Sequence, residues 1–345
     1  MAGRSWTAAK KLAWTAILAA AAVAAAPNGY RVIGKIQIGG EGGWDYVTVD
    51  SAARRAYVSH ATRVVVVDIE AGKVVGEIPD TPGVHGIAIA PKLGRGFVSN
   101  GRSNNVTIFD LKTLKSVGQA PAGQNPDSIL YDEASGRVFT FNGRSNDATA
   151  INAKSGAAEG TIPLGGKPEF SVADGKGSVY VNIEDTNEIA VIDSRKLTVS
   201  KRYALSGCDA PTGLALDNAR RRLFSVCGNK VMIVSDPDAG KVVGSVPIGP
   251  GSDGAGFDPG RGLAFSSNGG DGTLTMVRET SGKYEVAGNV TTQPGARTMT
   301  VDPVTHKVYV PAARYGPPVP AATGQKKGGR PPMLPDSFVL LVVGQ

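Results

Sequence analysis

The sequence of 345 residues predicts an all-β fold, a seven-bladed β-propeller with four antiparallel strands in each blade. Three observations lead to this prediction. A pattern of short strands recurs seven times with a period near 40 residues, which is typical of propeller blades. The recurring segments are β-branched and are separated by turn residues. A segment near the N-terminus matches the one strand that the last copy lacks.

The first strand of each copy is marked by the residue at which it ends. The ends are Asp50, Ala90, Asp132, Asp174, Asp217, Asp258 and Asp302. Successive ends differ by 40, 42, 42, 43, 41 and 44 residues. No segment after residue 30 sustains a helical apolar period over three turns, so helical repeats are excluded.

The second and third strands carry the strongest pattern. The second strands are expected at residues 57–60, 97–100, 139–142, 180–183, 224–227, 265–268 and 309–312. The third strands are runs of β-branched residues that end in Asp, such as 64–68, 106–110 and 189–193. The fourth strand is weaker, as expected for the outer edge of a blade.

Closure of the ring can be tested in the sequence. The seventh copy has a third strand at 338–343, and the chain stops at Gln345 without a fourth. The unassigned segment 31–38 matches the outer strand 241–248. We therefore expect the N-terminal strand to complete the last blade, which leaves no unpaired edge. Residues 30–345 then form one propeller domain, and we expect a monomer.

The second-strand motif Tyr/Phe-Val-Thr/Ser-Asn, together with the strand-Asp turn and the Val-x-Val-Ile-Asp run, resembles the YVTN β-propeller repeat family and its YncE-like branch, within the WD40/YVTN repeat-like superfamily. The resemblance covers nearly all of residues 30–345. It implies an extracytoplasmic seven-bladed propeller, often of unassigned activity. The sequence departs from the motif at Ile183, Cys227 and Ala312, which occupy the Asn position.

The N-terminus has the pattern of a secretory signal peptide. Arg4, Lys10 and Lys11 precede an uncharged run, 12–26, that ends in three alanines. The alternative is an uncleaved membrane anchor, but 15 residues are short for a span of about 20. We expect residues 1–26 to be removed, the mature chain to have no membrane span, and the protein to be periplasmic or secreted. Removal of these three positive charges lowers the net charge from +7 to +4.

Export changes the interpretation of the two cysteines, because exported proteins meet an oxidising compartment. Cys208 is expected just before one strand and Cys227 at the end of its antiparallel neighbour. The sequence therefore favours a disulfide over two separate thiols.

The aspartates at the strand ends suggest a carboxylate cluster, but a structural role explains them better. Each side chain can accept backbone N–H bonds in its own turn. We expect Asn100, Asn142 and Asn268 to act in the same way in the loops between second and third strands.

The residues that start the innermost strands are expected to face the mouth of the central channel. These residues are Asp45, His85, Asp127, Glu169, Thr212, Asp253 and Arg297. Six of the seven are ionisable, which is more charge than a closed apolar plug requires, so the ring could bind a polar ligand or a cation. A His with carboxylates suits several divalent metals, so the metal stays unknown. The alternative is a ring solvated by channel water.

The loops between second and third strands are expected to form the rim of the same face. They contribute His60, Arg102, Arg144, Glu184 and Arg314. The tetrapeptide Gly-Arg-Ser-Asn occurs at 101–104 and again at 143–146. Two neighbouring arginines could clamp a carboxylate or a phosphate. Alternatively, the two loops are related turns kept from a duplication.

The segment 313–337 interrupts the last blade and is rich in Pro, Gly and basic residues. Connections of this length are usually functional or disordered. It could be a lid, an arm that binds a partner, or a loop without a role.

No enzyme motif stands out. The sequence has no G-x-S-x-G, H-E-x-x-H, P-loop or C-x-x-C-H motif, so no catalytic residue and no cofactor are assigned. The leading hypothesis is an exported binding or scaffold protein for a protein, an envelope polymer or a small polar ligand. The alternative is a lactonase-like hydrolase in which channel carboxylates hold a divalent metal. A third hypothesis is nucleic-acid binding by the rim arginines and the basic loop, although four excess charges give a weak electrostatic attraction.

Overall fold

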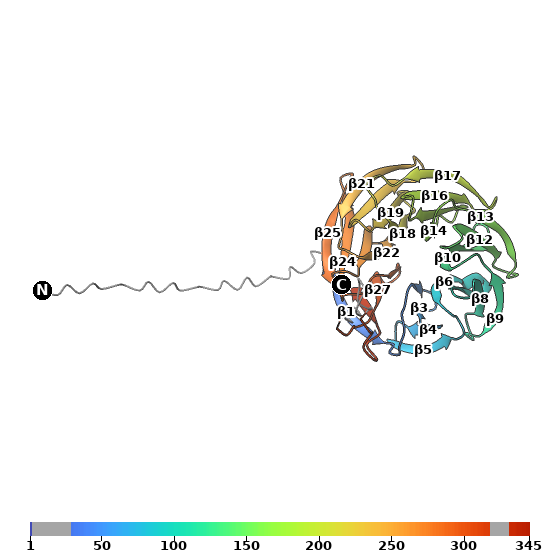
Figure 1. Ribbon diagram of the computed structural model, residues 1–345, viewed down its shortest axis with the longest axis horizontal. Coiled ribbons are helices and arrows are strands. Elements are labelled where there is room, and N and C mark those ends of the chain that lie inside the picture. Colours follow the sequence, from blue (N-terminus) through green and yellow to red (C-terminus); the bar gives the residue numbers. More distant parts are fainter. Residues whose placement is uncertain (2–28, 318–330) are drawn as a thin grey trace.

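The computed structural model describes Met1, residues 29–317 and residues 331–345, which form seven four-stranded sheets around a ring (Figure 1). Neighbouring strands within each sheet are antiparallel. The prediction of a seven-bladed propeller is confirmed. The predicted signal peptide, apart from Met1, and residues 318–330 of the predicted insertion lie outside the described residues.

The first three blades run from the innermost to the outermost strand along the chain. Their strands are β2 (Val47–Asp50), β3 (Arg55–His60), β4 (Arg63–Asp68), β5 (Lys73–Ile78), β6 (Val84–Ala90), β7 (Arg95–Asn100), β8 (Asn105–Asp110), β9 (Ser116–Pro121), β10 (Pro126–Asp132), β11 (Arg137–Asn142), β12 (Asp147–Asn152) and β13 (Ala158–Pro163). A 3-10 turn, Pro91–Leu93, joins β6 to β7.

The remaining four blades repeat this order, except that the last takes its outer strand from the N-terminus. Their strands are β14 (Pro168–Ala173), β15 (Ser178–Ile183), β16 (Glu188–Asp193), β17 (Thr198–Ala204), β18 (Pro211–Asp217), β19 (Arg222–Cys227), β20 (Val231–Asp236), β21 (Lys241–Pro247), β22 (Ser252–Asp258), β23 (Leu263–Asn268), β24 (Thr273–Thr280), β25 (Lys283–Thr291), β26 (Thr300–Asp302), β27 (Lys307–Ala312), β28 (Val339–Gly344) and β1 (Arg31–Gln37).

The core lies between neighbouring blades. The second and third strands are buried on both faces, which explains their continuous β-branched sequences: Val64, Val66 and Val67 of β4 are fully buried. Tyr57 of the first blade and Phe109 of the second meet between the two sheets with ring centroids 5.8 Å apart. The outer strands face solvent and bury few side chains.

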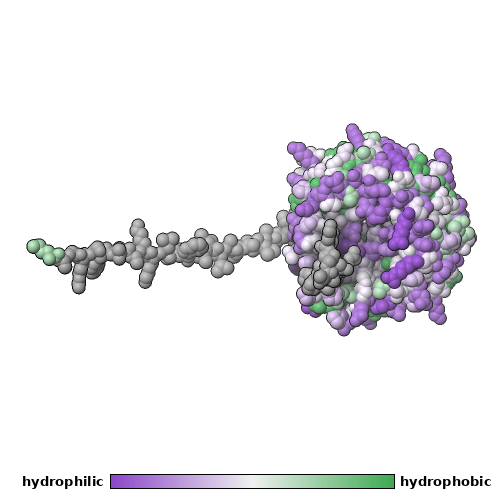
Figure 2. Space-filling view, viewed as in Figure 1, coloured by the Kyte–Doolittle hydropathy of each residue, from purple (hydrophilic) through white to green (hydrophobic). Residues whose placement is uncertain are grey.

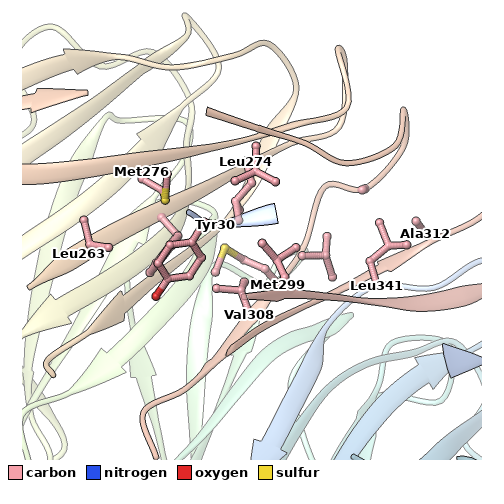
Figure 3. Packing of buried hydrophobic residues seen from close by; sticks show 13 residues of the cluster. Tyr30, Leu263, Leu274, Met276, Met299, Val308, Ala312 and Leu341 are labelled. Atoms are coloured by element: carbon pink, nitrogen blue, oxygen red, sulfur yellow. The ribbon is translucent and has the colours of Figure 1, made fainter. Parts of the chain in front are cut away.

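The ring is closed by pairing of the two ends of the chain. β1 pairs antiparallel with β28, from Arg31 opposite Gly344 to Gln37 opposite Val339. Tyr30 packs into an apolar cluster with Leu263 and Met276 of the sixth blade and Val308 of the seventh (Figure 3). The expected closure of the last blade by the N-terminal strand is confirmed.

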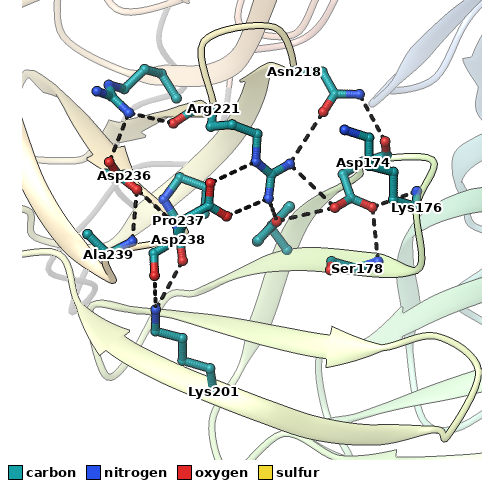
Figure 4. Close-up of polar contacts among 12 residues, drawn as sticks. Asp174, Lys176, Ser178, Lys201, Asn218, Arg221, Asp236, Pro237, Asp238 and Ala239 are labelled. Carbon is teal, nitrogen blue, oxygen red and sulfur yellow. Dashed lines mark hydrogen bonds and ion pairs between the residues drawn. The ribbon is translucent and has the colours of Figure 1, made fainter.

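Strand-end aspartates bond to their own turns, as predicted. Asp50 accepts the Ala53 N–H at 3.0 Å, and Asp302 accepts the Val304 N–H at 3.0 Å. Asp174 accepts the N–H groups of Lys176 and Ser178 (Figure 4).

The expectation for the three asparagines is wrong in its detail. Asn142 is fully buried and donates from Nδ2 to Asp147 Oδ1 at 2.6 Å and to Thr149 Oγ1 at 3.0 Å. Asn100 and Asn268 donate to the matching side chains in their own blades. The amide therefore links the second strand to the third through side chains, rather than by accepting backbone N–H bonds.

The central channel is narrowed by aromatic side chains below its mouth. Tyr46 of the first blade and Phe170 of the fourth meet across the ring with centroids 5.3 Å apart. Polar side chains cover much of the face of the ring seen in Figure 2, with hydrophobic residues in scattered patches. Among the described residues, no helix has the length and apolar character needed to cross a membrane.

Candidate functional site at the channel mouth

The seven predicted mouth residues lie together around the channel, and we call them the mouth ring. Four of them form a chain of contacts across neighbouring blades. Arg297 Nε donates to Asp253 Oδ2 at 2.8 Å, and its Nη2 lies 3.3 Å from Asp45 Oδ1. Asp45 Oδ2 lies 2.7 Å from His85 Nδ1. The fifth member, Asp127, places Oδ1 3.6 Å from the same nitrogen.

The other half of the mouth ring is held by a lysine. Lys167 Nζ donates to Glu169 Oε1 at 2.6 Å and also pairs with Glu184. Thr212 is the exception among the seven, because its hydroxyl donates to the backbone carbonyl of Ser252 at 3.1 Å. The structure therefore brings six of the predicted residues into ionic contacts and leaves Thr212 in a structural role.

Buried side chains of the second strands fix the backbone of the mouth ring. Ser99 of β7 donates to the Asp127 carbonyl at 2.5 Å, and Ser267 of β23 donates to the Arg297 carbonyl at 2.5 Å. Asn182 of β15 donates to the Thr212 carbonyl at 2.7 Å. Each bond crosses from one blade to the next, so the repeat itself positions the ring.

Burial raises the pKa of three acidic groups in the ring, Asp127, Glu169 and Asp253. Desolvation, followed by the charge of Asp45, raises the pKa of Asp127 to about 6 against the opposing charge of His85. Desolvation and the charge of Asp127 raise the pKa of Glu169 as well. Desolvation raises the pKa of Asp253, although Arg297 opposes it.

The basic groups, in contrast to the acidic ones, are biased toward their charged forms. Burial lowers the pKa of His85, but its hydrogen bond to Asp45 and the charge of Asp127 outweigh burial and raise the pKa overall. The pKa of Lys167 is raised in the same way, because two carboxylates outweigh its burial. The pKa values of Lys167 and Glu169 are both raised, for different reasons. Two carboxylates stabilise the charged form of Lys167, whereas burial beside Asp127 disfavours the charged form of Glu169.

A cleft of about 580 Å³ opens over the first three blades and the mouth ring. Asp45, His85 and Arg297 line its floor, and Arg102 and Arg144 line its sides. Within the described ranges, neither rim arginine makes a side-chain hydrogen bond or ion pair. The cleft therefore offers two free guanidinium groups beside a buried acidic floor.

The two arginines stand on equivalent turns. Gly101 and Gly143 donate to carbonyls of the preceding loops at 2.9 and 3.0 Å, and the turns that follow have matching backbone bonds. Gly101 also makes room for the ring, because a Cβ at this position would lie 2.6 Å from His85 Nε2. The repeated tetrapeptide thus presents one arginine from each of two neighbouring blades.

The prediction for His60 as a rim residue is wrong. His60 is fully buried, and its ring lies 4.5 Å from that of Phe338. Burial and the charge of Arg63 lower its pKa to about 4. His60 occupies the second-strand position of Asn100, Asn142 and Ile183, all of which are fully buried.

The remaining rim residues have separate surroundings. Glu184 is bound by Lys167, as described above. Arg314 is exposed and lies outside the lining of the cleft. The described ends of the predicted insertion, including Tyr315 and Met333, line a neighbouring hollow of about 510 Å³ that shares Gly42 and Gly43 with the cleft.

Sequence reasoning missed Lys167, which binds two acidic residues of the mouth. Lys167 lies two positions before Glu169, and strand periodicity places such a pair on one face. This two-residue spacing is the sequence signal from which the pairing of Lys167 with Glu169 could have been predicted.

The predicted disulfide between Cys208 and Cys227 is present, at the mouth end of the fifth blade.

Comparison with known proteins identifies only the fold of this chain. No protein-family model matches the chain, and no curated protein matches it by sequence. Solved structures match in large number. A chain of hydrazine synthase from Kuenenia stuttgartiensis has a TM-score of 0.70 and 14% identity, covering 78% of this chain and 92% of that one. U3-55K has a TM-score of 0.71 and 8% identity, covering 89% and 97%. Together with the seven sheets, these likenesses show a β-propeller.

Proposed function

We propose that this chain is an exported β-propeller binding protein that captures a small polar ligand with a carboxylate or phosphate group at its channel mouth. The observation that carries the proposal is a pair of guanidinium groups, those of Arg102 and Arg144, which line a cleft of about 580 Å³ and have no side-chain partner among residues 29–317 and 331–345. Small-molecule sites commonly have volumes of about 300–1,000 Å³. Guanidinium groups suit carboxylate and phosphate oxygens because their N–H groups form a planar fork.

The ligand is expected to be polar at both ends. Its anionic group would lie at the rim, between the two arginines. The floor contains Asp45, which accepts hydrogen bonds. Asp127 lies next to the floor, 3.6 Å from His85, and its raised pKa leaves it able to accept or donate near neutral pH. Hydroxyl or ammonium groups of the ligand would therefore face the floor.

Export is part of the proposal. It rests on the signal-like segment 1–26 and on the disulfide between Cys208 and Cys227, a bond found mainly in oxidising compartments. The second-strand motif supports placement in the YVTN repeat family, YncE-like branch. A periplasmic or secreted protein follows from these features together.

The test is calorimetric titration of the purified protein with citrate, inorganic phosphate and fractions of an envelope extract. We expect at least one of these to bind, and the double variant Arg102→Ser/Arg144→Ser to weaken binding at least tenfold. Arg314→Ser is the matched control, since it removes an exposed arginine outside the cleft.

Three outcomes would overturn the proposal. These are a lack of binding by the unaltered protein, full binding by the double variant, and preferential binding of an oligonucleotide that weakens steeply with salt. The last result would assign the arginines to nucleic-acid phosphates.

A lactonase-like hydrolase is the second candidate, and Glu169 favours it. A carboxyl group with a raised pKa keeps its proton near neutral pH and can protonate a leaving oxygen. Hydrolysis of a lactone panel with added calcium, manganese or zinc, lost in Glu169→Gln, would establish this activity. Absence of turnover across the panel would discard it.

A further inference from the structure

Three potential metal ligands from three consecutive blades converge at the floor of the cleft, which Asp45 and His85 line and which Asp127 adjoins next to His85. Asp45 precedes β2, His85 lies in β6 and Asp127 lies in β10. One carboxylate oxygen from each aspartate and one His85 nitrogen all lie within 4.8 Å of one another. The three residues belong to separate sheets, so the fold of the ring, rather than one local turn, brings them together.

The hydrogen bonds of the group leave one oxygen unpartnered. His85 Nδ1 can carry a single proton, and Asp45 Oδ2 at 2.7 Å is its partner. Asp127 Oδ1 lies 3.6 Å from the same nitrogen, which is too far for a hydrogen bond. This oxygen is shielded from solvent and has no hydrogen-bond partner within the described part of the chain. A buried anionic oxygen without a partner is costly, and it points into the group.

The cations at the mouth are shared between carboxylates. Arg297 pairs with both Asp45 and Asp253, and Lys167 pairs with both Glu169 and Glu184. Among the described residues, no lysine or arginine forms an ion pair with Asp127, whose nearest cationic partner is His85 at 3.6 Å. A divalent cation would supply the positive charge that this carboxylate lacks.

We infer that Asp45, His85 and Asp127 form a binding site for a divalent cation of the Zn²⁺ or Mn²⁺ type. A histidine nitrogen with two carboxylate oxygens suits such first-row ions. Ca²⁺ instead takes six to eight oxygen ligands, so an imidazole nitrogen does not suit it. Three protein ligands leave at least one coordination position for water or for a ligand group, and that position faces the cleft.

The distances require only a small adjustment. Two atoms that are each about 2.1 Å from a tetrahedral ion lie about 3.4 Å apart. The His85–Asp127 separation of 3.6 Å is close to this value, and the Asp45–His85 separation of 2.7 Å would have to lengthen. The cation would replace the proton now shared by Asp45 and His85. Arg297, at 3.3 Å from Asp45 Oδ1, orients the carboxylate from outside the group.

The test is titration of chelator-treated, full-length protein with ZnCl₂ and MnCl₂ alone, followed by calorimetry and native mass spectrometry. We expect one ion per chain, and at least a tenfold loss of affinity in His85→Gln and in Asp127→Asn. Cobalt(II) should give a d–d absorption spectrum typical of nitrogen and oxygen ligands, and His85→Gln should abolish it.

The matched control uses a second histidine–aspartate pair. His306 Nδ1 lies 3.0 Å from Asp258 on the opposite end of the strands, and no third metal-ligating group joins it in the described residues. His306→Gln should leave ion binding unchanged. A lack of binding to the unaltered protein, or equal binding by the His85 and His306 variants, would overturn the inference. Circular dichroism establishes that each variant is folded. Because the titrant is the metal alone, failure here leaves the proposed binding by Arg102 and Arg144 intact.

Discussion

Carboxylates lie at both ends of the innermost strands, but their hydrogen-bond partners and pKa shifts differ between the two ends. At the turn end, Asp302 is fully buried but accepts hydrogen bonds from the Val304 N–H and the Thr305 hydroxyl. Its pKa is lowered, because these bonds outweigh desolvation. At the mouth end, Asp127 and Glu169 are also largely shielded, and desolvation raises their pKa values.

The difference comes from what each end can offer as a partner. A tight turn supplies N–H groups two and three residues beyond the aspartate, so each turn satisfies its own carboxylate. Asp174 extends this arrangement into a network with Arg221 and Asn218 (Figure 4). At the mouth, the partners are other charged side chains, and those of Asp45, Asp127 and Asp253 stand on other blades. Carboxylates without local donors are the ones left available for a ligand.

The largest expected effect concerns the mouth end of the fifth blade, where Thr212 replaces a charged residue and a disulfide joins Cys208 to Cys227. Replacement of both cysteines by serine should lower the free energy of unfolding by about 3 kcal/mol, as the loss of a cross-link over a separation of 19 residues predicts. Urea denaturation measures the change. Addition of a reductant to the unaltered protein should give a similar loss. An unchanged midpoint would show that this end of the blade needs no covalent support.

A smaller loss of folding stability is expected from a change at the turn end of an innermost strand. Asp302→Asn should destabilise the fold by about 1–3 kcal/mol at pH 7, because a neutral amide replaces a buried, hydrogen-bonded carboxylate. The folded pKa of Asp302 lies below the usual 3.8, so this contribution is present above that pH and is lost as the pH falls through the folded pKa. Urea titrations at pH 7, 5 and 3 measure the gap between the free energies of unfolding of the unaltered protein and the variant. This gap should close only at pH 3. Asp209→Asn, in an exposed residue of the mouth side, is the control. A gap that persists at pH 3 would contradict the electrostatic explanation.

The same contrast explains how much the sequence could predict. The strand ends, the seven blades and the closing strand followed from periodicity, because each blade repeats one local pattern. The mouth ring followed from topology alone, since every innermost strand starts on the same face.

What lay beyond prediction depends on contacts between blades. The pairing of Arg297 with Asp45 and Asp253, which stand on two other blades, is made by side-chain geometry that no local pattern encodes. The burial of His60 was predictable in principle. Aligning the second strands places it at a core position that Ile183 also occupies.

The smallest expected effect has the opposite sign and tests the mouth end directly. Because the folded pKa of Glu169 is raised, its contribution to stability is present at acid pH and is lost as the pH rises through the folded pKa of about 8. Glu169→Gln should therefore match the unaltered protein near pH 5 and exceed it by roughly 1 kcal/mol at pH 9, after allowance for the lost bond to Lys167.

Chelator-treated protein should be used, so that bound metal does not add to the difference. Glu285→Gln, in an exposed residue of β25, should show no such dependence. If Glu169→Gln were instead destabilising at pH 9, the pair with Lys167 would outweigh burial. The mouth carboxylates would then resemble those of the turn end, with their charges already satisfied by the fold.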